Sequence, residues 1–187
     1  IGALGRLVHK KGFRYLLEAL PPLLSAMPEA RCVIGGDGDL REELESSAAS
    51  LGVSDRVVFP GHVDWQETPD FFRMCDVVAI PSVVDDLGNV DGLPNVVLEA
   101  MASARCVVAS RVGGIPSVLE DGRTGILVEP GDPAALGAAL GRVARDADLR
   151  ARLGESARAH VAERLQWSAV FDRHLAVYHG VAARPGV

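Results

Sequence analysis

The sequence contains few cysteines, and their spacing excludes the usual cysteine-based sites. Three occur in 187 residues, at Cys32, Cys75 and Cys106. They form no C-x-x-C motif, no zinc-ligand pattern and no recognisable disulfide framework. Each lies in or beside an apolar segment, so we expect buried free thiols in a protein of a reducing compartment.

Long apolar runs are also missing. No uninterrupted apolar segment approaches the roughly 20 residues of a membrane span, and no charged segment precedes the first apolar residues as in a signal peptide. The first residues read instead as a strand, and we expect that the sequence is a part of a longer protein. The apolar residues AVILMFWYC make up 48% of the chain, which is enough for a globular core. These features predict a cytoplasmic protein.

Positive charge is scarce. The chain has 19 basic and 25 acidic residues, a net charge of −6, and its first 100 residues hold only eight of the basic ones. Without a basic stripe, this balance argues against a nucleic-acid partner. Only two of the basic residues are lysines, and Lys10 and Lys11 are adjacent, with Arg6 and Arg14 close by. This is the one local concentration of positive charge in the acidic half.

Short apolar runs alternate with longer amphipathic segments over residues 1–128. The near-continuous apolar runs are typical of strands covered on both faces, and their alternation with helices predicts a parallel, doubly wound sheet. We therefore expect a Rossmann-like α/β fold with six parallel strands and helices on both faces. The predicted strands are 1–7, 31–36, 56–60, 77–81, 106–110 and 125–128, and the predicted helices between them are 12–27, 39–51, 65–75, 94–103 and 114–120.

The remainder of the chain predicts a helical extension, with helices at 132–147, 148–164 and 166–180. Pro21 and Pro22 are expected to kink or split the first helix, because proline removes a backbone donor. The last helix carries an apolar stripe that packs either on the domain's own core or on a surface outside this sequence. We expect the second case, with a neighbouring copy as the cover. The stripe consists of Trp167, Val170, Phe171, Leu175 and Tyr178.

The loops that follow the predicted strands are the expected ligand site, because ligands of open α/β sheets bind at the carboxyl ends of the strands. After the first strand, Gly5 permits close backbone approach, while Arg6 and Lys11 can bind phosphate oxygens. After the fourth strand, a polar loop with Asp91 leads into a helix that begins near Pro94 and includes Glu99. The free N–H groups of this helix end could hold an anion or sugar hydroxyls.

Other polar loops carry weaker signals. Gly36, Asp37 and Asp39 belong to a glycine-rich turn whose D-x-D tripeptide is a poor metal signature, since Asp39 is well placed to cap the next helix. His62 follows the third strand without a nearby partner and is read as a loop residue rather than a base. The loop at 85–91 does not fit a calcium-binding pattern. We therefore predict no metal site.

Together these segments resemble the C-terminal, donor-binding half of a GT-B glycosyltransferase, of the retaining group 1 type (family 4). The resemblance runs through nearly the whole chain, with its motifs in order. They are GRLVHKKG at 5–12, GDGDL at 36–40, VVFPGHV at 57–63, DVVAIPS at 76–82, DGLPNVVLEAMA at 91–102, VVASRVGGIP at 107–116 and DGRTGILVEPGDPAAL at 121–136.

The resemblance implies roles for individual residues. Arg6 and Lys11 would bind the diphosphate of a nucleotide sugar, with no cofactor and no metal ion. Asp91 and Glu99 fall on the two acidic positions of the family's E-x7-E element: Asp91 near the donor sugar, although one methylene shorter than the usual glutamate, and Glu99 on the ribose hydroxyls. The backbone at His62 and Val63 would meet the base, UDP or GDP being the expected nucleotide. The backbone that would touch the sugar and phosphates is that of Gly92, Leu93, Pro94, Asn95, Val96 and Val97.

The resemblance also implies an absent N-terminal half that supplies the acceptor site. Residues 1–164 would form the nucleotide-sugar-binding domain, and residues 165–187 a helix that crosses to that half. The chain would then transfer nothing alone, and the full enzyme would act in polysaccharide or glycolipid synthesis, in the cytoplasm or peripherally at the inner face of a membrane. The alternatives are an epimerase-like GT-B domain, a phosphorylase, which would need a further lysine, and a non-catalytic nucleotide-binding module.

Overall fold

The computed structural model describes residues 1–182 and contains one six-stranded parallel sheet. Its strand order is β3-β2-β1-β4-β5-β6, so the sheet grows outward in both directions from the neighbouring strands β1 and β4. The predicted doubly wound fold is confirmed. The strands are β1 (Gly2–Leu4), β2 (Cys32–Gly35), β3 (Val57–Gly61), β4 (Val77–Ile80), β5 (Cys106–Ser110) and β6 (Ile126–Val128).

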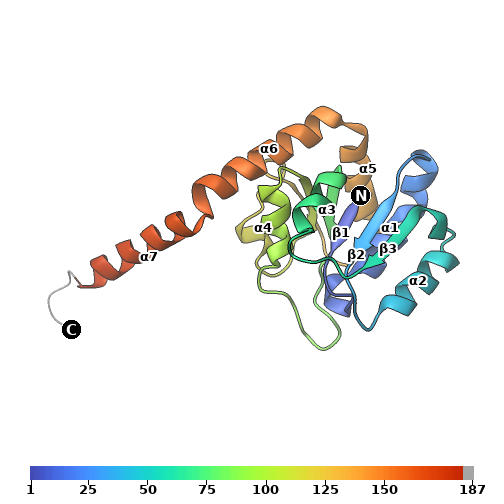
Figure 1. The fold of residues 1–187 in the computed structure, drawn as a ribbon, viewed down its shortest axis with the longest axis horizontal. Helices are drawn as coiled ribbons and strands as arrows, with labels where there is room; N and C mark the ends of the chain where they lie inside the picture. The colour runs from blue at the N-terminus through green and yellow to red at the C-terminus, as the bar shows by residue number, and fades with distance from the viewer. Residues whose placement is uncertain (183–187) are drawn as a thin grey trace.

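Seven α-helices and three short 3-10 helices connect and extend the strands within residues 1–182 (Figure 1). The α-helices are α1 (Phe13–Ala26), α2 (Arg41–Ser50), α3 (Thr68–Met74), α4 (Asn95–Ala102), α5 (Pro133–Arg145), α6 (Ala147–Arg164) and α7 (Trp167–Ala182). The 3-10 helices are η1 (His9–Lys11), η2 (Ser54–Arg56) and η3 (Ile115–Ser117).

Each face of the sheet has its own hydrophobic core. Alternate residues of a strand point to opposite faces, and in β4 Val77 and Ala79 join one core while Val78 and Ile80 join the other. The first core includes side chains of α1, α2, α5 and the first half of α6, and the second includes side chains of α3, α4 and the second half of α6. Helices therefore cover both faces, and the edge where the strands end remains the open one.

The proline pair does not split the first helix, because α1 runs without a break from Phe13 to Ala26 with Pro21 and Pro22 inside it. Seven of its side chains are buried, and the helix packs against α5. This burial offsets the hydrogen bonds that the two prolines cannot donate.

Most other predicted boundaries agree with the structure to within three residues, and two elements differ for a visible reason. β1 ends at Leu4 rather than at residue 7, because the N–H of Leu7 donates to the carbonyl of Asp37 and leaves the ladder. The helix predicted over 114–120 is only the 3-10 turn η3, followed by a bend in which the N–H of Thr124 donates to the carbonyl of Glu120.

The last helix does not pack on the sheet. In Figure 1, α7 extends beyond α6, away from the sheet. The apolar stripe is accordingly uncovered: Trp167 is 88% exposed and Phe171 is 61% exposed. The expectation that this stripe is not core is confirmed, whereas its covering by a second copy stays a prediction.

Substitution of Gly36 tests how closely the loops at the open edge are packed. Its φ is +128°, and a Cβ there would lie 1.9 Å from the carbonyl oxygen of Gly5. Gly52 also has a positive φ, +69°, but a Cβ there meets nothing within 4 Å. Gly52→Ala should cost about 1–2 kcal/mol of unfolding free energy through φ alone. Gly36→Ala adds overpacking and should cost about 3 kcal/mol or more. Denaturant unfolding of both variants measures the difference, and equal costs would contradict the close approach.

Candidate functional site

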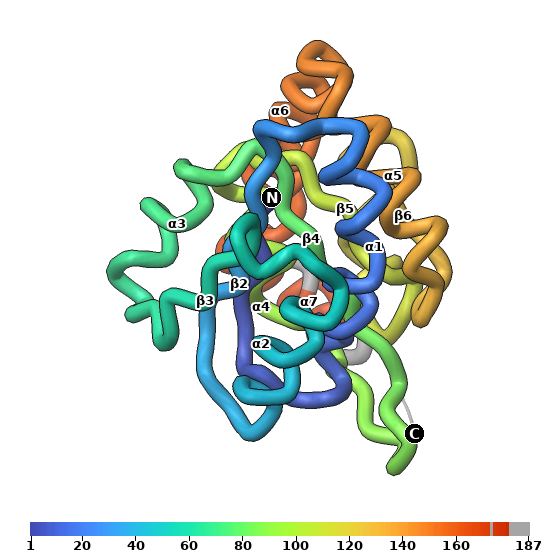
Figure 2. Tube along the Cα trace, turned by 90° about the vertical axis from the view of Figure 1, so that its right-hand side faces the viewer, coloured from blue at the N-terminus to red at the C-terminus, as the bar shows by residue number. Residues whose placement is uncertain are grey.

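The point where the sheet reverses its order lies between β1 and β4. The chain leaves β1 toward β2 and leaves β4 toward β5, so the two following loops lead to opposite sides of the sheet at its carboxyl edge. We call the place between these two loops the crevice. Ligands of doubly wound sheets bind at such a switch point. The loop between β4 and α4 projects from this edge as the green segment in Figure 2. The topology thus selects the same two loops as the sequence, residues 5–12 and 81–94.

Backbone hydrogen bonds fix the first of these loops on both sides. The N–H of Leu7 donates to the Asp37 carbonyl at 2.9 Å, and the N–H of Leu40 donates back to the Leu7 carbonyl at 3.0 Å. On the other side, the N–H of Val83 donates to the Lys10 carbonyl at 2.9 Å. The loop therefore holds its shape before any ligand arrives.

Both lysines of the chain converge on one carboxylate across the crevice. Lys11 Nζ lies 2.5 Å from Asp91 Oδ2, and Lys10 Nζ lies 2.9 Å from Asp91 Oδ1. The Asp91 side chain is only 15% exposed. Its burial raises the pKa, but the hydrogen bonds and charges of Lys11 and Lys10 outweigh burial and hold the pKa of Asp91 below its usual value. The structure thus brings Lys11 together with Asp91, two residues that the sequence analysis selected separately, and adds Lys10.

This cluster carries a surplus of positive charge. One carboxylate faces two ammonium groups, and the guanidinium of Arg6, on the same loop, is exposed and has no side-chain ion pair or hydrogen bond within residues 1–182. At Gly5, next to Arg6, a Cβ would come 3.4 Å from Lys11 Cε. The arrangement suits an anionic ligand, since unpaired and partly paired cations bind phosphate oxygens.

The segment after Asp91 is packed tightly against the turn that follows β5. Gly113 has a φ of +57°, and a Cβ there would lie 2.2 Å from the Asp91 carbonyl oxygen. The N–H of Gly114 donates to the Gly92 carbonyl. The two glycines therefore position Asp91 and Gly92 just ahead of α4. Pro94, predicted as the first helical residue, is the N-cap of that helix.

The N-terminus of α4 is open to a ligand. Pro94 supplies no side-chain cap, so the N–H groups of Asn95 and Val96 are left for an outside acceptor. Leu93 and Val96 are partly buried and pack against the second core. The predicted roles of these residues are backbone roles, and their side chains anchor the helix.

Glu99 lies one turn farther along, on the same face of α4 as Asn95. Partial burial of its carboxyl raises the pKa. The residue lines a shallow hollow between α3 and α4, together with Trp65, Thr68, Pro69, Phe72, Ala102 and Ser103. Trp65 is 80% exposed there. The hollow offers an aromatic face beside a carboxylate.

His62 and Val63 are placed differently from each other. His62 is exposed, its Nε2 lies 3.3 Å from Asp64 Oδ1, and it belongs to no metal-ligand group among the described side chains. Val63 packs against the second core, close to Gly35. The predicted contact with a base is a backbone contact and requires neither side chain.

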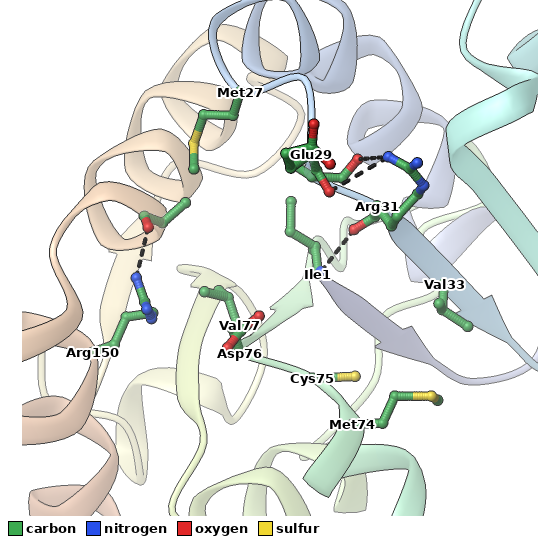
Figure 3. A pocket seen from close by; sticks show the side chains of 12 residues that line it. Ile1, Met27, Glu29, Arg31, Val33, Met74, Cys75, Asp76, Val77 and Arg150 are labelled. Carbon is green, nitrogen blue, oxygen red and sulfur yellow. Dashed lines mark hydrogen bonds between the residues drawn. The ribbon is translucent and has the colours of Figure 1, made fainter.

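A second hollow lies at the opposite edge, where the strands begin (Figure 3). Its basic groups are engaged with backbone carbonyls: the Ile1 ammonium donates to the Arg31 carbonyl at 2.8 Å, and Arg150 donates to the carbonyls of Val143 and Ala144. It shares no residue with the crevice.

Sequence reasoning missed Lys10 and Trp65 as site residues. The adjacency of the only two lysines was a signal for Lys10, but its contact with Asp91 links residues 81 positions apart along the chain. Trp65 carried no pattern, since a lone tryptophan in a loop gives none. Within the described part of the chain, no helix is long and apolar enough to cross a bilayer, and no group of three His, Cys, Asp or Glu side chains could hold a metal ion.

Comparison with known proteins agrees with the fold. The family model "Glycosyl transferases group 1" matches residues 1–146. The chain is 38% identical over 165 residues to the GDP-mannose-dependent alpha-(1-6)-phosphatidylinositol monomannoside mannosyltransferase of Mycolicibacterium smegmatis, covering 88% of this chain and 43% of that protein.

Solved structures show the same fold. Anabaena Alr3699/HepE in complex with UDP superposes with a TM-score of 0.84 at 25% identity, covering 96% of this chain and 48% of that one. The C-terminal domain of the group 1 glycosyl transferase LpcC from Francisella tularensis superposes with a TM-score of 0.77 at 28% identity, covering 89% and 85%.

The chain matches only a part of the length of the curated relatives. The chain spans about two fifths of the curated relatives it matches. It covers most of the separate C-terminal domain and about half of the Anabaena structure. From the family match over residues 1–146 and the shared GT-B type fold, the chain belongs to the glycosyl transferases group 1 family.

Proposed function

We propose that the chain is the donor-binding half of a retaining, family 4 glycosyltransferase, which moves a sugar from a nucleotide sugar to an acceptor. The observation that carries the proposal is the convergence of Lys10, Lys11 and Asp91 at the switch point of the sheet. UDP in a structural relative and GDP-mannose in the name of a sequence relative support a nucleoside diphosphate as the ligand.

The diphosphate would lie between the β1 loop and the N-terminus of α4. Arg6 and Lys11 would neutralise the charge that develops on the leaving diphosphate, which is the task a metal ion has in other transferases. Gly5 leaves space for close approach, and the N–H groups of Asn95 and Val96 would bind further oxygens. The transfer therefore needs no divalent cation in this proposal.

The nucleoside would extend from the diphosphate toward α3. The Glu99 carboxylate would accept hydrogen bonds from the ribose hydroxyls, and the base would lie near the backbone of His62 and Val63, with Trp65 at the border of the same hollow. Asp91 and the backbone of Gly92 and Leu93 would face the sugar. The resemblance and the placement of each residue at the open edge together support these assignments.

The acceptor site would belong to an N-terminal half outside this sequence, so the isolated chain is expected to bind a nucleotide without transferring sugar. The exposed stripe of α7 supports this division, because an uncovered Trp167 and Phe171 are the kind of surface that a neighbouring domain covers. The full enzyme would act in the cytoplasm, in polysaccharide or glycolipid synthesis.

Lys11→Ala tests the diphosphate site. Loss of a charged hydrogen-bonding partner costs about 1.5–3 kcal/mol, so the affinity for UDP or GDP should fall about tenfold or more. Arg14→Ala is the matched control, since Arg14 lies 3.9 Å from Glu18 on α1 and should change the affinity by less than about twofold. Calorimetry with magnesium and with EDTA should give equal affinities. Unchanged affinity of Lys11→Ala, or binding only with magnesium, would contradict the assignment.

Glu99→Gln and Asp91→Asn should differ in their effect on nucleoside diphosphate binding. The glutamine loses an acceptor for ribose hydroxyls and weakens binding, whereas the asparagine releases Lys11 from its ion pair and does not weaken it. Because the pKa of Glu99 is raised, wild-type affinity should decline as the pH falls through that raised pKa, and Glu99→Gln should remove this decline. Calorimetric titrations at several pH values measure both effects. If Asp91→Asn weakened nucleoside diphosphate binding and Glu99→Gln did not, the two roles would be reversed.

Trp65 should report the nucleoside by fluorescence. The chain has two tryptophans, and Trp167→Phe leaves Trp65 as the sole emitter. Addition of UDP or GDP should quench the emission of the Trp167→Phe variant, with the same midpoint as calorimetry. The reciprocal variant Trp65→Phe retains only Trp167, on α7, and should show no quenching. Binding without any change at Trp65 would place the nucleoside elsewhere.

A further inference from the structure

Lys10 has no role in the proposed reaction, yet the structure holds it at the same carboxylate as Lys11. Its Nζ lies 2.9 Å from Asp91 Oδ1, while Lys11 occupies Oδ2. Its carbonyl accepts the N–H of Val83 at 2.9 Å. Backbone and side chain of Lys10 thus both join the β1 loop to the β4 loop.

The two lysines differ in their surroundings. The Lys11 side chain is 18% exposed and passes over Gly5, where a Cβ would lie 3.4 Å from its Cε. The Lys10 side chain is 34% exposed. Lys11 is therefore the one that lies against the backbone of the crevice, and Lys10 is at its rim.

A diphosphate that takes Lys11 must take it from Asp91. The Asp91 carboxylate is largely buried, and its pKa is held down by these two lysines. A buried carboxylate without a partner is costly, so the departure of Lys11 would oppose ligand binding unless another cation stays on Asp91. Lys10 is the second cation on that carboxylate among the described side chains.

We propose that Lys10 is a positioning residue, which keeps Asp91 paired and in place when Lys11 transfers from Asp91 to the diphosphate of the ligand. This proposal rests on the proposed function. Lys10 acts through Asp91 and makes no contact with the ligand, which separates its role from that of Lys11.

A double-mutant cycle between Lys10 and Asp91 tests this role through nucleotide affinity. The 187-residue chain is titrated with UDP and GDP by calorimetry, as wild type, Lys10→Met, Lys10→Arg, Asp91→Asn and the double variant Lys10→Met/Asp91→Asn. Arg14→Met is the control for the loss of one positive charge near the site, and thermal unfolding verifies that each variant is folded.

Lys10→Met should weaken binding about three- to fivefold, in the range of a partly exposed ion pair, and Lys10→Arg should restore most of the affinity. In the Asp91→Asn background, Lys10→Met should lower the nucleotide affinity no more than Arg14→Met does, because position 91 then carries no carboxylate that needs a cation. A purely structural role of Lys10 would lower the unfolding temperature of Lys10→Met and leave its nucleotide affinity unchanged.

Equal losses from Lys10→Met with and without Asp91 would overturn the proposal, since Lys10 would then act on the ligand directly. An unchanged affinity of Lys10→Met would overturn it as well, while leaving the donor site intact if Lys11→Ala still weakens binding. Absence of UDP and GDP binding by the wild-type chain would overturn both this role and the proposed function.

Discussion

The pairing of two ammonium groups with one carboxylate, across the point where the sheet reverses, organises the open edge of this domain. Asp91 belongs to the long loop between β4 and α4, whereas Lys10 and Lys11 belong to a loop fixed by backbone hydrogen bonds on both sides. The ion pairs therefore tie the long loop to the firmly held one. The start of α4, its open N–H groups and the position of Glu99 all follow from where the long loop is held.

The Asp91 carboxylate stabilises the adjacent lysines, but it also competes with an anionic ligand for them. Two lysines side by side repel each other, and Asp91 between them offsets that repulsion in a partly buried place. The same carboxylate occupies the cations that an anionic ligand needs. The surplus of one positive charge, together with the guanidinium of Arg6, which has no ion pair on the described surface, leaves positive charge for an anionic ligand. The shorter Asp91, in place of a glutamate, suits a carboxylate that stays close to the lysine loop.

The strands and the loops of the candidate site could be predicted from the sequence, because local patterns of apolar and polar residues determine them. Apolar runs located all six strands. Position after a strand then selected the loops with Arg6, Lys11 and Asp91, and the helix that carries Glu99. The errors have non-local causes: burial against α5 keeps α1 whole despite its two prolines, and a hydrogen bond to the Asp37 carbonyl shortens β1. The contact of Lys10 with Asp91 could not be predicted either, since nothing in a lysine's neighbours indicates a partner 81 positions away.

The last helix carries an apolar surface that the sheet cannot cover. Both faces of the sheet are already packed, by α1, α2 and α5 on one side, by α3 and α4 on the other, and by α6 at both cores, and α7 extends away from them. Its stripe with Trp167 and Phe171 nevertheless recurs at helical spacing on one face of the helix. Apolar side chains exposed to water on such a face do not stabilise the fold. Such a stripe is stabilising only against a second apolar surface. The chain thus presents a positively charged edge and an uncovered apolar stripe, and under the proposed function one N-terminal half would lie against both.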